Sequence, residues 1–335
     1  TMIEHVVGRV LKGQKASYRV LAFLKGQSVA KATTLPSGCS RHGSGLVAIK
    51  DLIFERELDT HRVPAIAESP YIRQLLDVID AEDGVQGAPR KLVFEWMDTD
   101  LWKHRPYGRL SHPELPQVVS KSVLEALAVF QSLNAVHTDI NPNNILLSNL
   151  DQPFPIVKVS DLDQAFMEGV NGEQAQTLET RAPEVWKGLG VWPTSDVWSV
   201  GITLVHCLMS KTPFGPGGKI IKDHTDAWCM AKLMRLRGRF DMEPGMKRYD
   251  EWELAIGLEA TDFKDPKTGE MRPYILGGTL EQELEKLPRE LCSWECIEFI
   301  LYLLEMDYKK RPTALEALQH PFIKSTVTWQ QQQKM

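Results

Sequence analysis

The spacing of apolar and polar residues changes once along the chain. Between about Ser17 and Leu101, short runs rich in β-branched and aromatic residues alternate with turn-forming residues, as in SYRVLAFL, SVAKATTL, LVAIK and KLVFEWM. From Ser111 onward, apolar residues instead recur every three or four positions. We therefore predict a small β-rich lobe over residues 1–97, a larger, mainly helical lobe over residues 98–325, and a polar tail over 326–335.

An amphipathic helix is predicted directly before an unusual polar loop. Apolar residues at helical spacing are Leu115, Val118, Val119, Val123, Ala126, Leu127 and Phe130. The next segment, VHTDINPNNILL, places one His, one Asp and three Asn among aliphatic residues, which is atypical of a core segment. ILL and PIVKVS then predict a hairpin with Asp139 at one mouth and Asp161 at the other, so we expect two carboxylates to converge on one cleft.

Composition narrows the class of protein. The 335 residues are 43% hydrophobic and 25% charged, as in an ordinary globular chain, and the net charge of −5 argues against nucleic acid as a partner. Five cysteines form no CxxC pair, so we expect reduced thiols, no zinc site, and an intracellular location in the cytoplasm or nucleus. The apolar run VWSVGITLVHCLM is shorter than the ~20 residues that cross a bilayer, which predicts a buried helix and no membrane association.

Four short motifs carry candidate chemistry: VAIK at 47–50, HTD at 137–139 with Asn144, DLD at 161–163, and APE at 182–184. Asn144 lies five positions after Asp139, and Asp161 follows Asn144 by 17. Together with DVWSVG from Asp196 and the Arg311–Pro312 pair, the series resembles the eukaryotic protein kinase superfamily from roughly Ser17 to Lys324. The resemblance implies an α+β, bilobal kinase-like fold, with a small antiparallel sheet and one helix before a mainly helical lobe that carries an insertion at about 215–289.

The resemblance implies a role for each charged motif residue. Lys50 would supply a cation to the nucleotide phosphates and pair with a carboxylate on the next helix, for which Glu57 is the first choice and Glu55 the second. Asp161 and Asn144 would bind Mg²⁺ or Mn²⁺, and Asp139 would accept or orient the proton of the substrate hydroxyl. In an arbitrary loop, the two aspartates would more often be turn or N-cap carboxylates, and the ordered motifs favour chemistry instead.

The nucleotide site is inferred from the same resemblance. Phe94 corresponds to the gatekeeper, Glu95 and Met97 would offer backbone groups to adenine, and Asp100 would reach the ribose. Apolar walls and the phosphate loop would come from Leu24, Gly26, Val29, Ala48 and Leu146. Core packing is the alternative explanation for any one of these apolar residues.

Departures from the family pattern bear on activity. The glycine-rich loop keeps only Gly26, and Asn141 stands where relatives carry a lysine near the γ-phosphate, which replaces a charge-assisted contact with a neutral one. Asp163 replaces the glycine of the metal-binding triplet. Thr138 replaces the arginine that grips a phosphorylated activation loop, so switching by phosphorylation of that loop is not expected.

Two further motif residues receive structural roles from the resemblance. Glu184 is expected to pair with Arg311 inside the helical lobe, and Asp196 to brace the catalytic loop from the start of a helix. The catalytic loop is closest to that of the serine-arginine protein kinases, within a branch that also holds the cyclin-dependent kinases, and Arg181 fits that branch.

Three hypotheses remain open from the sequence. The first is a serine/threonine protein kinase that uses ATP and Mg²⁺ or Mn²⁺ and acts on a protein substrate, with Asp139, Lys50 and Asn141 in the catalytic site. The second is a pseudokinase, a nucleotide-binding or scaffold module with weak or no phosphotransfer. The third is a kinase-fold enzyme that acts on something other than a protein hydroxyl, because fold alone does not determine function. The sequence does not indicate an oligomeric state.

Overall fold

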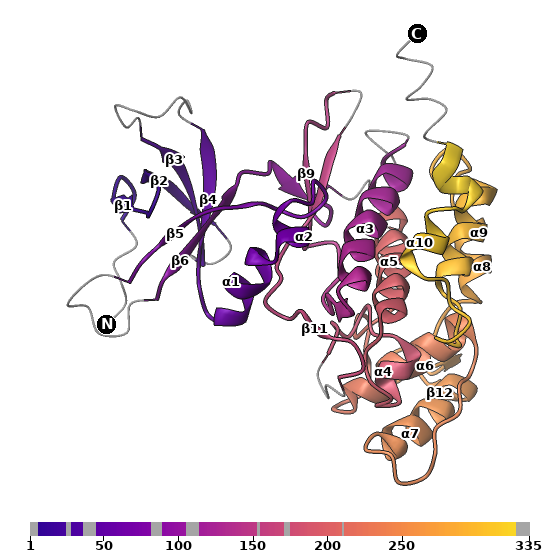
Figure 1. The fold of residues 1–335 in the computed structure, drawn as a ribbon. Helices are drawn as coiled ribbons and strands as arrows, with labels where there is room; N and C mark the ends of the chain where they lie inside the picture. The colour runs from indigo at the N-terminus through magenta and orange to yellow at the C-terminus, as the bar shows by residue number, and fades with distance from the viewer. Residues whose placement is uncertain are drawn as a thin grey trace. The chain divides into compact units, whose positions relative to one another are not determined.

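The structure is a computed structural model that describes residues 6–24, 28–35, 45–81, 89–104, 114–152, 155–170, 175–209 and 211–325. By their internal contacts, its residues divide into two units. The first consists of Thr1–Asp98 together with Ser160–Asp163, and the second of Thr99–Val159 and Gln164–Met335. Figure 1 traces the elements of each unit along the chain.

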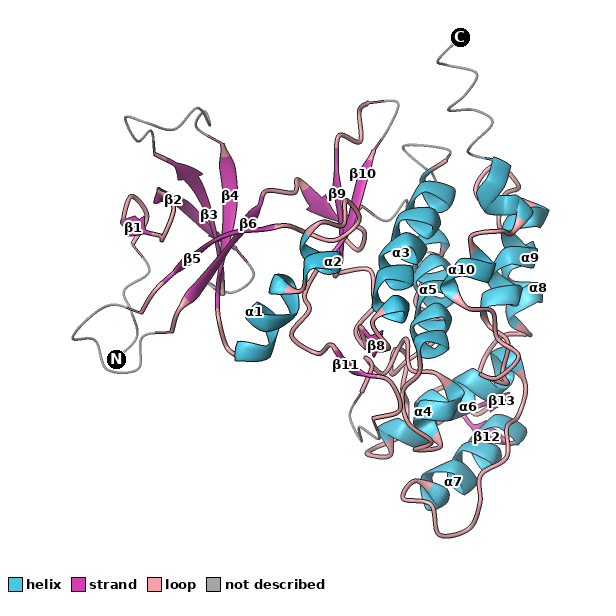
Figure 2. Cartoon of the chain, in the orientation of Figure 1, coloured by secondary structure: helices cyan, strands magenta, loops and turns pink. Residues whose placement is uncertain are grey.

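The first unit contains an antiparallel sheet. Its strands are β1 (Val10–Lys12), β2 (Ser17–Leu24), β3 (Val29–Thr34), β4 (Leu46–Asp51), β5 (Leu75–Ile79) and β6 (Lys91–Glu95). In the described residues they lie in the order β1-β2-β3-β4-β6-β5, and every neighbouring pair is antiparallel. Figure 2 shows these strands gathered into one sheet.

The two-residue period of the strands gives each face of this sheet its own core. Val47 and Ile49 of β4 and Val93 of β6 belong to a cluster on one face. In the register between β4 and β6, Ala48 lies opposite Phe94 and Lys50 opposite Leu92. Phe94 and Leu92 pack with Leu58 of the following helix, so the alternation places Lys50 on the face that this helix covers.

Two helices follow β4 in the first unit. Helix α1 (Glu55–Arg62) has acidic residues in its first turn and basic residues in its last, which complements the helix dipole. It is the helix expected from the sequence. A one-turn helix, α2 (Pro64–Ala67), begins directly after it with proline at its first position, where the missing N–H costs no helical hydrogen bond.

The second unit is mainly helical. Its helices are α3 (Leu115–Ser132), α4 (Pro183–Trp186), α5 (Pro193–Leu208), α6 (Thr225–Arg237), α7 (Tyr249–Ala260), α8 (Leu280–Glu285), α9 (Trp294–Leu303) and α10 (Ala314–Ala317). Its short strands are β7 (Thr99–Asp100), β8 (Ala135–Val136), β9 (Ile145–Ser148), β10 (Ile156–Val159), β11 (Phe166–Met167), β12 (Asp262–Lys264) and β13 (Met271–Pro273). Within the predicted insertion, α6, α7, β12, β13 and α8 are ordered elements that the sequence analysis did not resolve.

Helices α3 and α5 pack against each other in the core of this unit. The amphipathic helix predicted before the polar loop is confirmed as α3, and the predicted buried apolar helix is confirmed as α5, which is buried from Ser195 to Leu208. None of the helices in the described part of the chain has both the length and the apolar character needed to cross a membrane.

Short strands hold the ends of the polar loop. The predicted hairpin is confirmed: β9 and β10 pair in antiparallel fashion, and β7 pairs with the other edge of β9. Before the loop, β8 pairs with β11. The loop is therefore anchored by a strand at each end, which limits how far its polar side chains can move. The described cysteines, Cys207, Cys229, Cys292 and Cys296, are free and buried, and Cys39 lies outside the described residues.

Candidate active site

A buried carboxylate holds the polar loop through two backbone N–H groups of the loop. Asp196, in the first turn of α5, accepts the backbone N–H of His137 at 2.6 Å and that of Thr138 at 2.9 Å. Burial raises the pKa of Asp196 to about 7, and these two N–H groups oppose the rise. Thr138 has a left-handed backbone (φ 66°), and its hydroxyl donates to the carbonyl of Gln164 at 2.7 Å. The predicted bracing role of Asp196 is confirmed.

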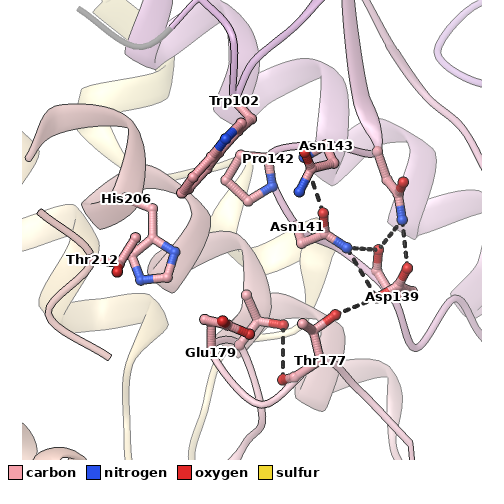
Figure 3. Close-up of a pocket in the computed structure, with 11 residues that line it drawn as sticks. Trp102, Asp139, Asn141, Pro142, Asn143, Thr177, Glu179, His206 and Thr212 are labelled. Atoms are coloured by element: carbon pink, nitrogen blue, oxygen red, sulfur yellow. Dashed lines mark hydrogen bonds between the residues drawn. The ribbon is translucent and has the colours of Figure 1, made fainter. Parts of the chain in front are cut away.

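The Asp139 carboxylate is held by three side-chain donors. Oδ1 accepts the Asn141 amide at 2.9 Å and the Thr177 hydroxyl at 2.5 Å, and Oδ2 accepts the Asn144 amide at 2.6 Å. Figure 3 shows the side chains of Asn141 and Thr177 pointing toward Asp139. Asn141 also accepts the backbone N–H of Asn143 at 3.0 Å, so its side chain spans the turn of the loop. The carboxylate is thus oriented by neutral groups.

A cavity of about 530 Å³ opens beside this carboxylate, within the second unit. Asp139, Asn141 and Thr177 line one side of it, and Trp102 and His206 line another (Figure 3). A cavity of this size exceeds the room that a few water molecules need and lies within the range of small-ligand sites. It can therefore admit a side chain of a second molecule to the oxygen atoms of Asp139.

Lys50 lies between two carboxylates of the first unit. Its Nζ is 2.9 Å from Oε1 of Glu57 and 2.6 Å from Oδ1 of Asp161. Burial disfavours the charged amine, but the carboxylates of Asp161 and Glu57 outweigh it, so the pKa of Lys50 is raised. Burial also raises the pKa of Glu57, and the charge and hydrogen bond of Lys50 offset only part of this rise. Of the two glutamates weighed from the sequence, Glu57 contacts Lys50, whereas Glu55 contacts Arg90.

The predicted metal ligands belong to different units, Asp161 to the first and Asn144 to the second. The Asn144 amide nitrogen faces Asp139, which makes Oδ1 the atom suited to a hard cation. Asp161 has a left-handed backbone (φ 68°), and its side chain is 37% exposed beside Lys50. Among the described residues no group of three His, Cys, Asp or Glu could hold a metal. Oδ1 of Asn144 and the Asp161 carboxylate are each hard oxygen donors of the kind that Mg²⁺ takes, and that ion usually retains waters and substrate phosphates as further ligands.

The backbone near Asp163 is held by an arginine of α1. Arg56 donates through Nε to the Asp163 carbonyl at 3.1 Å, and its Nη2 also donates to that oxygen. Asp163, which stands where the family pattern has glycine, is thus bonded through its backbone to α1, the helix that also carries Glu57.

The residues expected to line the nucleotide site lie in several places. Within the first unit, Ala48 and Phe94 are buried, Val29 is half-buried, and Leu24 is 38% exposed at the end of β2. Val29 lies opposite both Leu24 and Lys50 in the sheet registers, which groups these residues on adjacent strands. Gly26 lies outside the described residues.

Four further nucleotide-site predictions lie at the end of β6 and beyond it. Glu95 ends β6, Met97 is buried, and Leu146 is buried in β9 of the second unit. The Asp100 carboxylate accepts the backbone N–H of Lys103 at 2.9 Å and lies 2.9 Å from its Nζ. These contacts give Asp100 a turn-capping role, while its contact with ribose stays a prediction.

Buried polar contacts hold the segment that leads into the APE motif. Arg311 makes a two-pronged pair with Glu184 at 2.7 and 2.9 Å, and their side chains are almost fully buried. The predicted pairing is confirmed. Arg181 donates to the backbone carbonyls of Ala175 and Gln176. Gln176 has a left-handed backbone (φ 64°) and bonds to α5 through Ser199.

Thr177 was not among the site residues predicted from the sequence. Its contact with Asp139 joins residues 38 positions apart, which no local pattern can indicate.

Comparisons with known proteins agree on one family. A family model described as protein kinase domain matches residues 37–323. Homeodomain-interacting protein kinase 2 of Mesocricetus auratus is 26% identical over 260 residues, which cover 70% of this chain, and homeodomain-interacting protein kinase 1 of Rattus norvegicus is 25% identical over 261 residues, also 70% of this chain. The chain spans about a fifth of the length of these relatives, 22% and 21%. In fold it resembles a chain of the yeast RNA Pol II CTD kinase CTDK-1 complex, with a TM-score of 0.67, 20% identity and 92% of each chain covered.

Proposed function

The chain belongs to the protein kinase family, and from that premise we propose that it transfers the γ-phosphate of a nucleoside triphosphate to a serine or threonine hydroxyl of a protein, with Mg²⁺ or Mn²⁺ as cofactor. The observation that carries the proposal is the Asp139 carboxylate, held by three donors at the edge of a cavity. A carboxylate fixed in this way suits the orientation of an incoming hydroxyl and the acceptance of its proton.

The remaining side chains supply position and charge. Lys50, held by Glu57, would contact the phosphates, and Asp161 with Asn144 would hold the metal ion. When bound, the metal ion neutralises phosphate charge. Asp139 takes the proton at one of its carboxylate oxygens, while Asn141, Asn144 and Thr177 keep the carboxylate in place.

A labelled-nucleotide assay tests the proposal. Purified protein is incubated with γ-labelled ATP, Mg²⁺ or Mn²⁺ and generic protein substrates, and the phosphorylated residue type is identified by mass spectrometry. We expect label on serine or threonine and a loss of about 10²–10⁴ in rate for Asp139→Asn, the usual effect of removing a positioned base. Asp151→Asn, a carboxylate change at an exposed turn, is the matched control. Equal rates for wild type and Asp139→Asn would refute the role of Asp139.

The alternative is a binding module without efficient transfer. One observation favours it: the Asn141 side chain is engaged by Asp139 and Asn143, so this position supplies loop geometry and no cation for a phosphate. The same assay separates the two functions, because a binding module incorporates little or no label and does so equally in wild type and Asp139→Asn.

A further inference from the structure

A half-buried arginine lies beside Phe94, the predicted gatekeeper residue. Arg73 precedes β5, and its Cζ lies 5.1 Å from the centre of the Phe94 ring. Its Nε donates a hydrogen bond to the backbone carbonyl of Glu95 at 3.1 Å. All three residues belong to the first unit. The guanidinium therefore spans the gatekeeper side chain and reaches the carbonyl at the end of β6.

Neighbouring contacts hold this arrangement in place. The Glu95 backbone N–H donates to the Gln74 carbonyl at 3.1 Å, and the Gln74 backbone N–H donates to the Glu95 carboxylate at 2.8 Å. Phe94 is buried, and the ring of His61 lies 5.0 Å from it. The backbone at Glu95 is thus locked to the segment that carries Arg73, which keeps Nε at the same carbonyl.

The guanidinium remains a cation at neutral pH. Burial lowers the pKa of Arg73 to about 10, and the carboxylates of Glu95, Asp161 and Glu57 oppose that shift. Among the described residues, the bond to Glu95 is the one hydrogen bond of Arg73, although a guanidinium has five N–H donors. Donors of Arg73 can therefore serve a ligand acceptor near the Glu95 carbonyl.

The family resemblance expects Glu95 to offer a backbone group to the adenine ring, and its carbonyl, an acceptor, suits a donor at the purine 6-position. The 6-amino group of adenine is a donor, so it would share the Glu95 oxygen with Arg73 and lie close to a positive charge. A 6-oxo group is an acceptor, so it would receive an N–H from the same guanidinium in a charge-assisted bond. We propose that Arg73 is a specificity-determining residue for the nucleobase, which disfavours 6-amino purine nucleotides and favours 6-oxo purine nucleotides. This inference rests on the proposed function.

Binding of two matched nucleotides tests it. Dissociation constants for ATP and inosine triphosphate, which differ at the purine 6-position and its neighbouring ring nitrogen, are measured by calorimetry with Mg²⁺. We expect the wild type to bind inosine triphosphate at least as tightly as ATP. For Arg73→Val, we expect the dissociation constant for ATP divided by that for inosine triphosphate to fall by about tenfold or more. The reason is that inosine triphosphate loses one charge-assisted hydrogen bond. Arg19→Val, at an exposed position on β2, is the control and should keep the wild-type ratio.

Each outcome decides the inference. A wild type that prefers ATP by tenfold or more overturns it, as does an unchanged ratio in Arg73→Val, and in both cases the proposed function stands. No binding of either nucleotide to wild type and variant refutes nucleotide use and the inference with it. If Arg73→Val does not unfold cooperatively, Arg73→Met takes its place, since methionine retains apolar contact with Phe94.

Discussion

Replacing Thr177 with valine removes one hydroxyl and preserves the shape of the side chain. That hydroxyl donates to Oδ1 of Asp139 at 2.5 Å, in the described cavity. The amides of Asn141 and Asn144 remain on the carboxylate at 2.9 and 2.6 Å, so the substitution removes one of three donors. We expect the carboxylate to stay near its place with greater freedom to rotate.

The size of the effect follows from the kind of bond that is lost. A hydrogen bond to a charged group contributes about 1.5–3 kcal/mol, and each 1.4 kcal/mol is a factor of ten in rate. The rate of phosphotransfer should therefore fall by about ten- to a hundredfold if the bond is made mainly in the transition state. A bond that is equally strong before reaction would lower the rate less.

The assay compares wild type, Thr177→Val and Thr177→Ser at saturating nucleotide. Serine keeps the hydroxyl, so Thr177→Ser should retain activity within a few-fold, and the dissociation constant for nucleotide should be unchanged in both variants. Thermal unfolding checks that each variant is folded. Equal phosphotransfer rates for wild type and folded Thr177→Val would show that the hydroxyl does not position Asp139 for catalysis.

Three further changes test other parts of the second unit. Arg311→Leu leaves the Glu184 carboxylate buried without its cation and should lower the unfolding free energy by about 3–5 kcal/mol in a denaturant titration, whereas a loss below about 1 kcal/mol would contradict the pairing. Thr180→Glu places a charge at a fully buried position, so we expect lower thermal stability and no gain in phosphotransfer; activation would refute this, because Thr138 offers no cation to an acidic group. Burial raises the pKa of Asp196 from 3.8 to about 7, so the folded state binds this proton more tightly and stability should fall as pH rises from about 4 to about 7. The difference in unfolding free energy between wild type and Asp196→Asn should shrink across that window, and a constant difference would show that Asp196 does not titrate there.

The family and the fold class could be predicted because their signals are local. Alternation of apolar residues located β2, β3, β4 and β6, and the ordered motifs identified the kinase fold, which the family match and the structural likeness confirm. Strands β1 and β5 were not identified, since each is short and carries charged residues beside its apolar ones. The order of strands in the sheet depends on pairing between distant segments, which periodicity does not contain.

The site could be predicted only in part, for a related reason. Motif positions indicated Asp139 and Lys50, and the pairing of Glu184 with Arg311 over 127 positions came from family resemblance rather than from a local pattern. Thr177 contacts Asp139 over 38 positions, and Arg73 contacts Glu95 over 22 positions. The residues beside Thr177 and Arg73 in the sequence do not indicate these partners. Such contacts become visible only when the fold brings the segments together.

The two candidate functions, enzyme and binding module, place different demands on the charges in each unit. In the second unit, neutral donors hold Asp139, so this loop fixes geometry without adding a cation near a transferred phosphate. In the first unit, the Lys50 cation lies between Glu57 and Asp161, and each carboxylate lowers the net charge that this cation presents to a phosphate. Since Asn141 adds none of its own, an active enzyme with this arrangement depends on its metal ion to neutralise the transferred group. A binding module, by contrast, needs only contacts that retain a nucleotide and does not need the charge of a transferred group to be neutralised.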